Sequence, residues 1–194
     1  MRKQKGFSLI ELLIVVAIIL IIAAIAIPNL LRAKISANES SAVGSIRNII
    51  TAETSYSASY NEYGFALTLN LLGPGIGNLT CPAAGPDPTK GACLLDSALG
   101  GAINSSKSGY NFEANADPLS KQAPDVNGIS AYTSFTATAV PATYNQSGVR
   151  AFCAGEDGVL RQNPNTANSA GSGLGIDFTP WATTCAKAPW SILQ

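Results

Sequence analysis

The chain has 194 residues with 12 basic and 12 acidic side chains, and only 12% of its residues are charged. This balance excludes a dedicated nucleic-acid surface, which would show as a cluster of lysine and arginine. The chain contains no histidine, which excludes the Ser-His and Cys-His pairs of many nucleophilic enzymes. No other catalytic cluster is recognisable, so the sequence predicts no enzymatic activity, no cofactor and no small-molecule substrate.

A long apolar segment lies near the N-terminus. Sixteen consecutive apolar residues fill Leu12–Ile27, and an apolar helix of roughly 20 residues spans the core of a lipid bilayer. Three basic residues precede this segment within the first five positions. Because basic flanks favour the cytoplasmic side, the N-terminus is expected in the cytoplasm. Arg32 and Lys34, beyond the far end, weaken this charge asymmetry.

Two residues of this region are unusual for a membrane span. Glu11 places a charge at the start of the apolar stretch, which costs roughly 2.5–3.5 kcal/mol on insertion scales, so a specific role is expected for it. Pro28 has no backbone N–H to donate, so it should kink or locally loosen the helix.

The segment Lys5–Pro28 begins Lys-Gly-Phe-Ser-Leu-Ile-Glu-Leu-Leu-Ile and follows a short basic prefix. It resembles the leader and N-methylation site of type IV prepilins, closely over residues 1–30 and loosely to about Tyr60. The resemblance implies that a prepilin peptidase cuts between Gly6 and Phe7 and that the new N-terminal Phe7 is methylated. Residues 1–6 would then be a leader peptide. Without such a cut, the segment would instead be a signal anchor.

The resemblance also implies a role for Glu11 in assembly. Glu11 would be the fifth residue after the cut, about one helical turn from the new amine of Phe7. In a bundle of helices its carboxylate would meet the amine of a neighbouring subunit, and pairing would offset much of the desolvation cost of both charges. Glu11 would thereby set the axial register between subunits. The alternatives are that Glu11 reaches the membrane surface or is protonated.

By this resemblance the chain is expected to be a structural subunit of a type IV pilus. Its partners would be further copies of itself in a helical homopolymer, the prepilin peptidase, the inner membrane and the pilus assembly machinery. It would stay in the inner membrane as a single-pass protein, with its head in the periplasm, until it joins a pilus on the cell surface. The alternatives are a pseudopilin of a type II secretion system, a minor pilin and a signal-anchored periplasmic binding protein.

The long helix is expected to cover residues 7–63, with residues 7–31 as the transmembrane segment and filament core. Beyond residue 31 it should become amphipathic and continue to about Tyr60, since apolar residues recur at helical spacing. The expected buried stripe includes Leu31, Ile35 and the later apolar positions, with Glu53 in the same register. Glu39 is expected to lie mostly off this stripe.

Residues 64–194 are expected to form a globular head. Short helical or extended pieces are possible near 67–72 and 94–99, and a flexible loop is expected at 163–175. Strand signals occur at 110–114, 132–140, 149–153 and 159–161, the last two flanking a turn with Asp-Gly at its tip. Three or four antiparallel strands packed on the helix give an α+β fold, a lollipop with a long stem.

Four cysteines in an exported domain favour disulfides. Of the three possible pairings we favour Cys81–Cys93 and Cys153–Cys185, each of which closes a loop of modest length. A zinc site is not expected, because there is no Cys-x-x-Cys spacing and no histidine. The acidic pair Glu156 and Asp157 is read as a solvated turn. The alternative is a calcium site with backbone carbonyls and Asp177.

Overall fold

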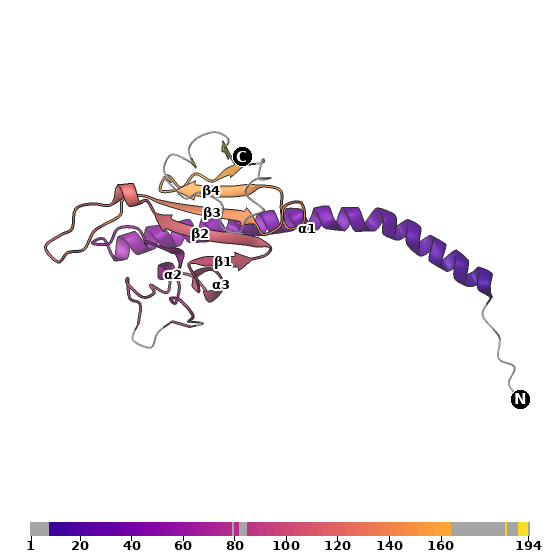
Figure 1. The fold of residues 1–194 in the computed structure, drawn as a ribbon, viewed down its shortest axis with the longest axis horizontal. Helices are drawn as coiled ribbons and strands as arrows, with labels where there is room; N and C mark the ends of the chain where they lie inside the picture. Colours follow the sequence, from indigo (N-terminus) through magenta and orange to yellow (C-terminus); the bar gives the residue numbers. More distant parts are fainter. Residues whose placement is uncertain (1–7, 79, 82–84, 164–184, 186–189, 194) are drawn as a thin grey trace, which may run out of the picture.

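The computed structural model describes residues 8–78, 80–81, 85–163, 185 and 190–193. Its dominant element is α1 (Leu9–Ser59), a helix of 51 residues and about 75 Å at 1.5 Å per residue. Figure 1 shows that one half of α1 lies against the head and that the other half extends freely away from it. This is the predicted α+β architecture, with a long helix packed on an antiparallel sheet.

The sheet has six described strands in chain order, each antiparallel to the one before it. They are β1 (Asn104–Lys107), β2 (Tyr110–Ala116), β3 (Phe135–Pro141), β4 (Ala151–Gly155), β5 (Arg161–Asn163) and β6 (Ser191–Ile192). The sequence pattern predicted only three or four strands. The additional ones, β1 and β6, are a polar edge strand and a strand of two residues, so neither carries the apolar alternation by which strands are recognised.

The second half of α1 packs on one face of this sheet. Ala114, Ala137 and Ala154 are paired across β2, β3 and β4 and form a row of small side chains. Two larger side chains lie next to this row. Phe112 on β2 and Phe152 on β4 are both cross-strand partners of Ala139, which lies between them on β3. The helix contributes a stripe of buried apolar residues: Ala42, Ile46, Ile49, Ala52 and Tyr56.

The stripe begins later than the sequence pattern predicted. Leu31 is exposed and Ile35 only partly buried, because the head does not reach that far along the stem. Burial starts at Glu39, which was expected to lie off the stripe. Glu39 is instead in register with Ala42 and Ile46, three and seven residues further on, which places all three on one face of the helix.

Among the described residues, two short helices lie between α1 and β1, and a 3-10 turn lies between β2 and β3. The short helix α2 (Leu69–Leu72) lies within the expected stretch 67–72, and α3 (Ser97–Gly100) overlaps the expected stretch 94–99 and ends one residue beyond it. Gly73 and Gly100 are packed so closely that a Cβ on either would overlap the backbone of the other. A 3-10 turn, η1 (Pro118–Ser120), follows β2. The loop expected at 163–175 falls, apart from Asn163 in β5, outside the described residues.

Candidate membrane and assembly surface of the stem

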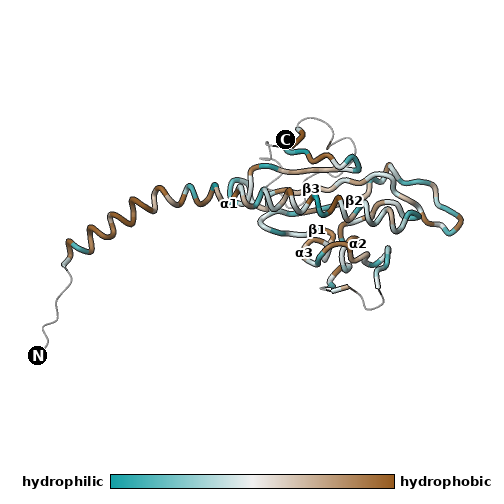
Figure 2. The backbone as a smooth tube through the Cα atoms, turned by 180° about the vertical axis from the view of Figure 1, so that it is seen from behind, coloured by the Kyte–Doolittle hydropathy of each residue, from teal (hydrophilic) through white to brown (hydrophobic). Residues whose placement is uncertain are grey.

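The free half of α1 is an apolar rod. Every described residue from Ser8 to Lys34 is exposed except Ala23, which is partly buried. Large side chains are among them, for example Leu9 at 78% and Leu30 at 71% exposure. Figure 2 shows the hydrophobic colour along this half and alternating colours along the other. Exposed apolar surfaces of this extent mark lipid or protein contacts.

By length and composition α1 is able to cross a membrane. The exposed apolar part from Leu9 to Leu31 is about 33 Å long at 1.5 Å per residue, close to the thickness of a bilayer core of about 30 Å. The same surface would suit a bundle of such helices, because it is apolar on all sides.

Glu11 lies in the first turn of this rod. Its side chain is exposed, and its Oε2 accepts a hydrogen bond from the backbone N–H of Ser8 at 3.0 Å. A carboxylate in the first turn is favoured by the helix dipole. Gly6 and Phe7, the residues of the expected cut, lie outside the described residues.

Pro28 lies inside α1, and the helix passes through it without interruption. Because proline cannot donate, the carbonyl of Ala24 lacks its usual i+4 helical donor. Figure 1 shows the free half of the stem as a gently curved, continuous helix.

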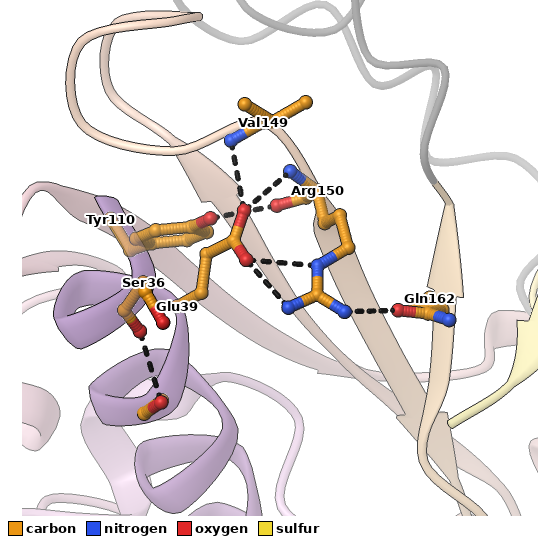
Figure 3. A network of polar contacts seen from close by, with 7 residues as sticks. Ser36, Glu39, Tyr110, Val149, Arg150 and Gln162 are labelled. Atoms are coloured by element: carbon orange, nitrogen blue, oxygen red, sulfur yellow. Dashed lines mark hydrogen bonds and ion pairs between the residues drawn. The ribbon is translucent and has the colours of Figure 1, made fainter. Parts of the chain in front are cut away.

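Glu39 and Arg150 join the stem to the head, as Figure 3 shows. The carboxylate of Glu39, 6% exposed, accepts four hydrogen bonds. Its Oε1 receives the backbone N–H groups of Val149 and Arg150, and its Oε2 receives Nε and Nη2 of Arg150 at 2.8 and 2.6 Å. The guanidinium thus binds one carboxylate oxygen with two donors while the backbone binds the other, and hydrogen bonds between ionised groups are stronger than those between neutral groups.

The loop that carries Arg150 is held from several sides. Arg150 Nη1 donates to Gln162 Oε1 on β5 at 2.8 Å, and the Tyr110 hydroxyl donates to the carbonyl of Arg150 at 2.8 Å. The Arg150 guanidinium also lies 5.7 Å from the centre of the Phe152 ring, a cation–π distance. The direction of the stem relative to the sheet is therefore fixed by a connected network.

Glu53 is a second buried carboxyl on the stem, and none of its surface is exposed. Its Oε2 accepts the backbone N–H of Ala66 at 2.9 Å, while its Oε1 has no hydrogen-bond partner among the described residues. Burial raises the pKa of Glu53 to about 8, a rise that the hydrogen bond from Ala66 only partly opposes. The carboxyl is therefore mostly neutral at pH 7.

The structure contains two disulfides, Cys81–Cys93 and Cys153–Cys185, with Cα–Cα distances of 5.8 and 6.0 Å. The first closes the loop between α2 and α3. The second ties Cys185 to β4. These distances lie in the usual range for disulfides.

Glu156 and Asp157, the acidic pair at the β4–β5 turn, each bind another side chain of the same chain. Glu156 accepts a hydrogen bond from the Ser134 hydroxyl at 2.8 Å, and Asp157 forms an ion pair with Arg161 at 2.5 Å. The hydrogen bond from Arg161 is the main reason that the pKa of Asp157 is lowered. No metal-ligand cluster is found in the part of the chain that the structure describes. Asp177, the third residue of the calcium alternative, lies outside it.

Residues 1–27 match a known family, the prokaryotic N-terminal methylation motif. The chain is 46% identical over 63 residues to the type IV wide pilus major component PilA4 of Thermus thermophilus, covering 32% of this chain and 48% of that protein. It is 36% identical over 121 residues to the type IV major pilin protein PilA of Myxococcus xanthus, covering 59% and 54%. No solved structure gives a significant match.

The chain is also 36% identical over 62 residues to the type II secretion system core protein G of Aeromonas hydrophila, covering 32% of this chain and 43% of that protein. The matches thus span about half the length of these relatives. The chain thus combines an apolar exposed half-stem, a head packed on the other half and the N-terminal methylation motif. It is similar to type IV pilins and to a type II secretion core protein.

Proposed function

We propose that the chain is the precursor of a structural subunit of a type IV pilus and that it polymerises through the apolar half of α1. One observation carries the proposal: the head buries only the second half of the helix and leaves the first half exposed. Such a surface needs lipid before assembly and other helices after it. Two relatives named as a pilus major component and a major pilin support the same reading.

In this proposal residues 1–6 are a leader that a prepilin peptidase removes between Gly6 and Phe7. The amine of Phe7 is then methylated. The subunit waits in the inner membrane with residues 64–194 in the periplasm, and the assembly machinery transfers it into the filament. No relative reported above is named as an enzyme, and the proposed role requires no catalytic residue.

Processing is tested by mass spectrometry of the N-terminus of protein sheared from the cell surface. We expect an abundant species that begins at N-methylated Phe7. A chain that still begins at Met1 would contradict the proposal, because the subunit would then be a signal-anchored protein. Cells that produce the unaltered chain but lack prepilin peptidase activity provide the control, and they should yield only the uncut chain.

Glu11→Gln should abolish most filament assembly. The substitution would leave the amine of a neighbouring Phe7 buried without its counter-charge, at a cost on the order of 3 kcal/mol, or about 100-fold in association per subunit. The measurement is the amount of sheared filament relative to the membrane pool. Glu62→Gln, an exposed glutamate at the far end of the stem, is the matched control and should assemble normally. Normal assembly of the Glu11→Gln variant would remove the proposed register role.

A pseudopilin is the second candidate, because one relative is named as a type II secretion core protein. The two candidates differ in where the mature subunit accumulates. A pilus subunit should dominate the sheared surface fraction. The same methylated species confined to membrane and periplasm would favour the pseudopilin.

A further inference from the structure

A polar hollow lies where the stem leaves the head. It has a volume of about 350 Å³ and is bounded by the stem, the β1–β2 turn and the β3–β4 loop. None of its lining residues is acidic. Lys34 supplies an ammonium group with three donors, and Lys34 has no ion pair among the described residues. The hollow is therefore suited to an anion rather than to a cation.

The walls of this hollow are held in place before any ligand arrives. Asn38 on the stem donates to the carbonyl of Ser147 at 2.8 Å, and the Ser147 hydroxyl closes the β3–β4 loop by accepting from the backbone N–H of Thr143. Gly109 adopts a φ of +72°, and a Cβ there would lie 2.8 Å from that of Ser147. The turn and the loop are thus packed in direct contact, which gives the hollow a fixed shape.

The position of the hollow along the stem is the decisive observation. Leu31 ends the exposed apolar run, Lys34 follows about 5 Å further along the helix axis and Asn38 about 10 Å further. The headgroup layer on each side of a bilayer is about 5–8 Å thick. With Leu9–Leu31 in the membrane, the hollow opens at the depth of the lipid phosphates.

We propose that this hollow binds the headgroup of an anionic phospholipid, with Lys34 against the phosphate. Gln146, an exposed amide in the lining, would donate to the headgroup oxygens. The site would seat the head on the outer leaflet of the membrane before assembly, and the lipid would be released when the subunit enters a filament. The inference rests on the proposed function only in that α1 spans a membrane with the head on the far side.

The test uses the full chain as a monomer in phosphatidylcholine nanodiscs, with and without phosphatidylglycerol, followed by the amide chemical shifts of Gly109 and Ser147. We expect both amides to shift when phosphatidylglycerol is present. Lys34→Gln should weaken the apparent affinity about tenfold or more, as loss of one hydrogen bond to a charged group does, which exceeds the roughly fivefold worth of any basic residue near an anionic surface. Gln146→Ala should weaken it about threefold, as loss of one hydrogen bond does.

Arg32→Gln is the matched control, because Arg32 is equally exposed and close to the membrane but does not line the hollow. Equal losses of affinity for Lys34→Gln and Arg32→Gln would overturn the proposal, because the attraction to the anionic lipid would then not depend on the hollow. The same shifts with inorganic phosphate at equal concentration, or no shift at all, would also overturn it. Filament assembly plays no part in this readout, so its outcome is separate from the test at Phe7.

Discussion

Arg150→Met is expected to lower the free energy of unfolding of the head by about 3 kcal/mol. The substitution leaves the Glu39 carboxylate buried without its charged partner, and breaking one side of a buried pair typically costs 3–5 kcal/mol. The lower end applies here for two reasons. The side chain of Arg150 is 39% exposed, so water screens part of the pair, and Glu39 keeps the backbone N–H groups of Val149 and Arg150.

Urea unfolding of the detergent-solubilised chain, followed by circular dichroism, measures this loss. Lys90→Met is the control, because Lys90 belongs to a solvated ion pair with Asp87 at 3.6 Å, and surface pairs contribute about 1 kcal/mol or less. A loss no greater for Arg150→Met than for Lys90→Met would mean that the ion pair of Glu39 and Arg150 adds nothing to the attachment of the stem to the head.

The stability of the head is expected to fall as the pH rises from about 4.5 to about 8, because of Glu53. The pKa of Glu53 is about 8 in the folded chain against 4.5 for an ordinary glutamate. Between these values the folded state binds more protons than the unfolded state, so the free energy of unfolding decreases with pH. The total decrease in the free energy of unfolding is on the order of 5 kcal/mol. None of this decrease has occurred below about pH 4.5, and all of it has occurred above about pH 8.

Glu53→Gln separates this effect from other titrations. At pH 5 the variant and the wild type should differ by about 1 kcal/mol or less, because the neutral carboxyl and the amide are similar in size and Oε1 of the wild type also lacks a hydrogen-bond partner among the described residues. At pH 8 the variant should be the more stable, since glutamine cannot ionise. The measurement is the midpoint of urea unfolding of the wild type and of Glu53→Gln at pH 5 and pH 8. Glu62→Gln, at an exposed position, is the control. Parallel pH profiles for the wild type and Glu53→Gln would show that the native head accommodates an ionised Glu53.

The sequence predicted the stem best. The stem is apolar on all sides in its first half and on one side in its second half, and both patterns depend on local spacing. The helix α1 ends at Ser59, one residue before Tyr60 and four before the bound of 63 that was also predicted. The central strands were also predicted, with bounds that differ by up to three residues, because their alternation indicates burial on one face. The strand β1 was missed because it lacks apolar alternation, although the two-residue turn Ser108-Gly109, with positive φ at both positions, is a local hairpin signal.

The buried position of Glu39 was the hardest feature to predict, whereas Glu53 was expected on the stripe and is buried there. Glu39 was assigned to the outer face because a charge is rarely buried unless paired, and its partner Arg150 is 111 residues away in the chain. A signal was nevertheless present. Glu39 and Glu53 occupy the positions that complete the stripe of Ala42, Ile46 and Ile49 at alternating steps of three and four residues. A glutamate in register with a buried apolar stripe indicates either a charged partner elsewhere in the chain or a carboxyl whose pKa is raised by burial.

The simple order of the sheet has a consequence for how the protein is made. Every strand pairs with its predecessor in the chain, and each cysteine bonds to its neighbour in the sequence. A chain exported from its N-terminal end can therefore extend one growing edge, and no strand has to insert between two that are already paired. Pairing between strands that are neighbours in the chain keeps the sequence separation of these contacts small, which favours rapid formation of the sheet. A delay in export would leave a shorter but correctly ordered sheet, with few opportunities for mispaired disulfides.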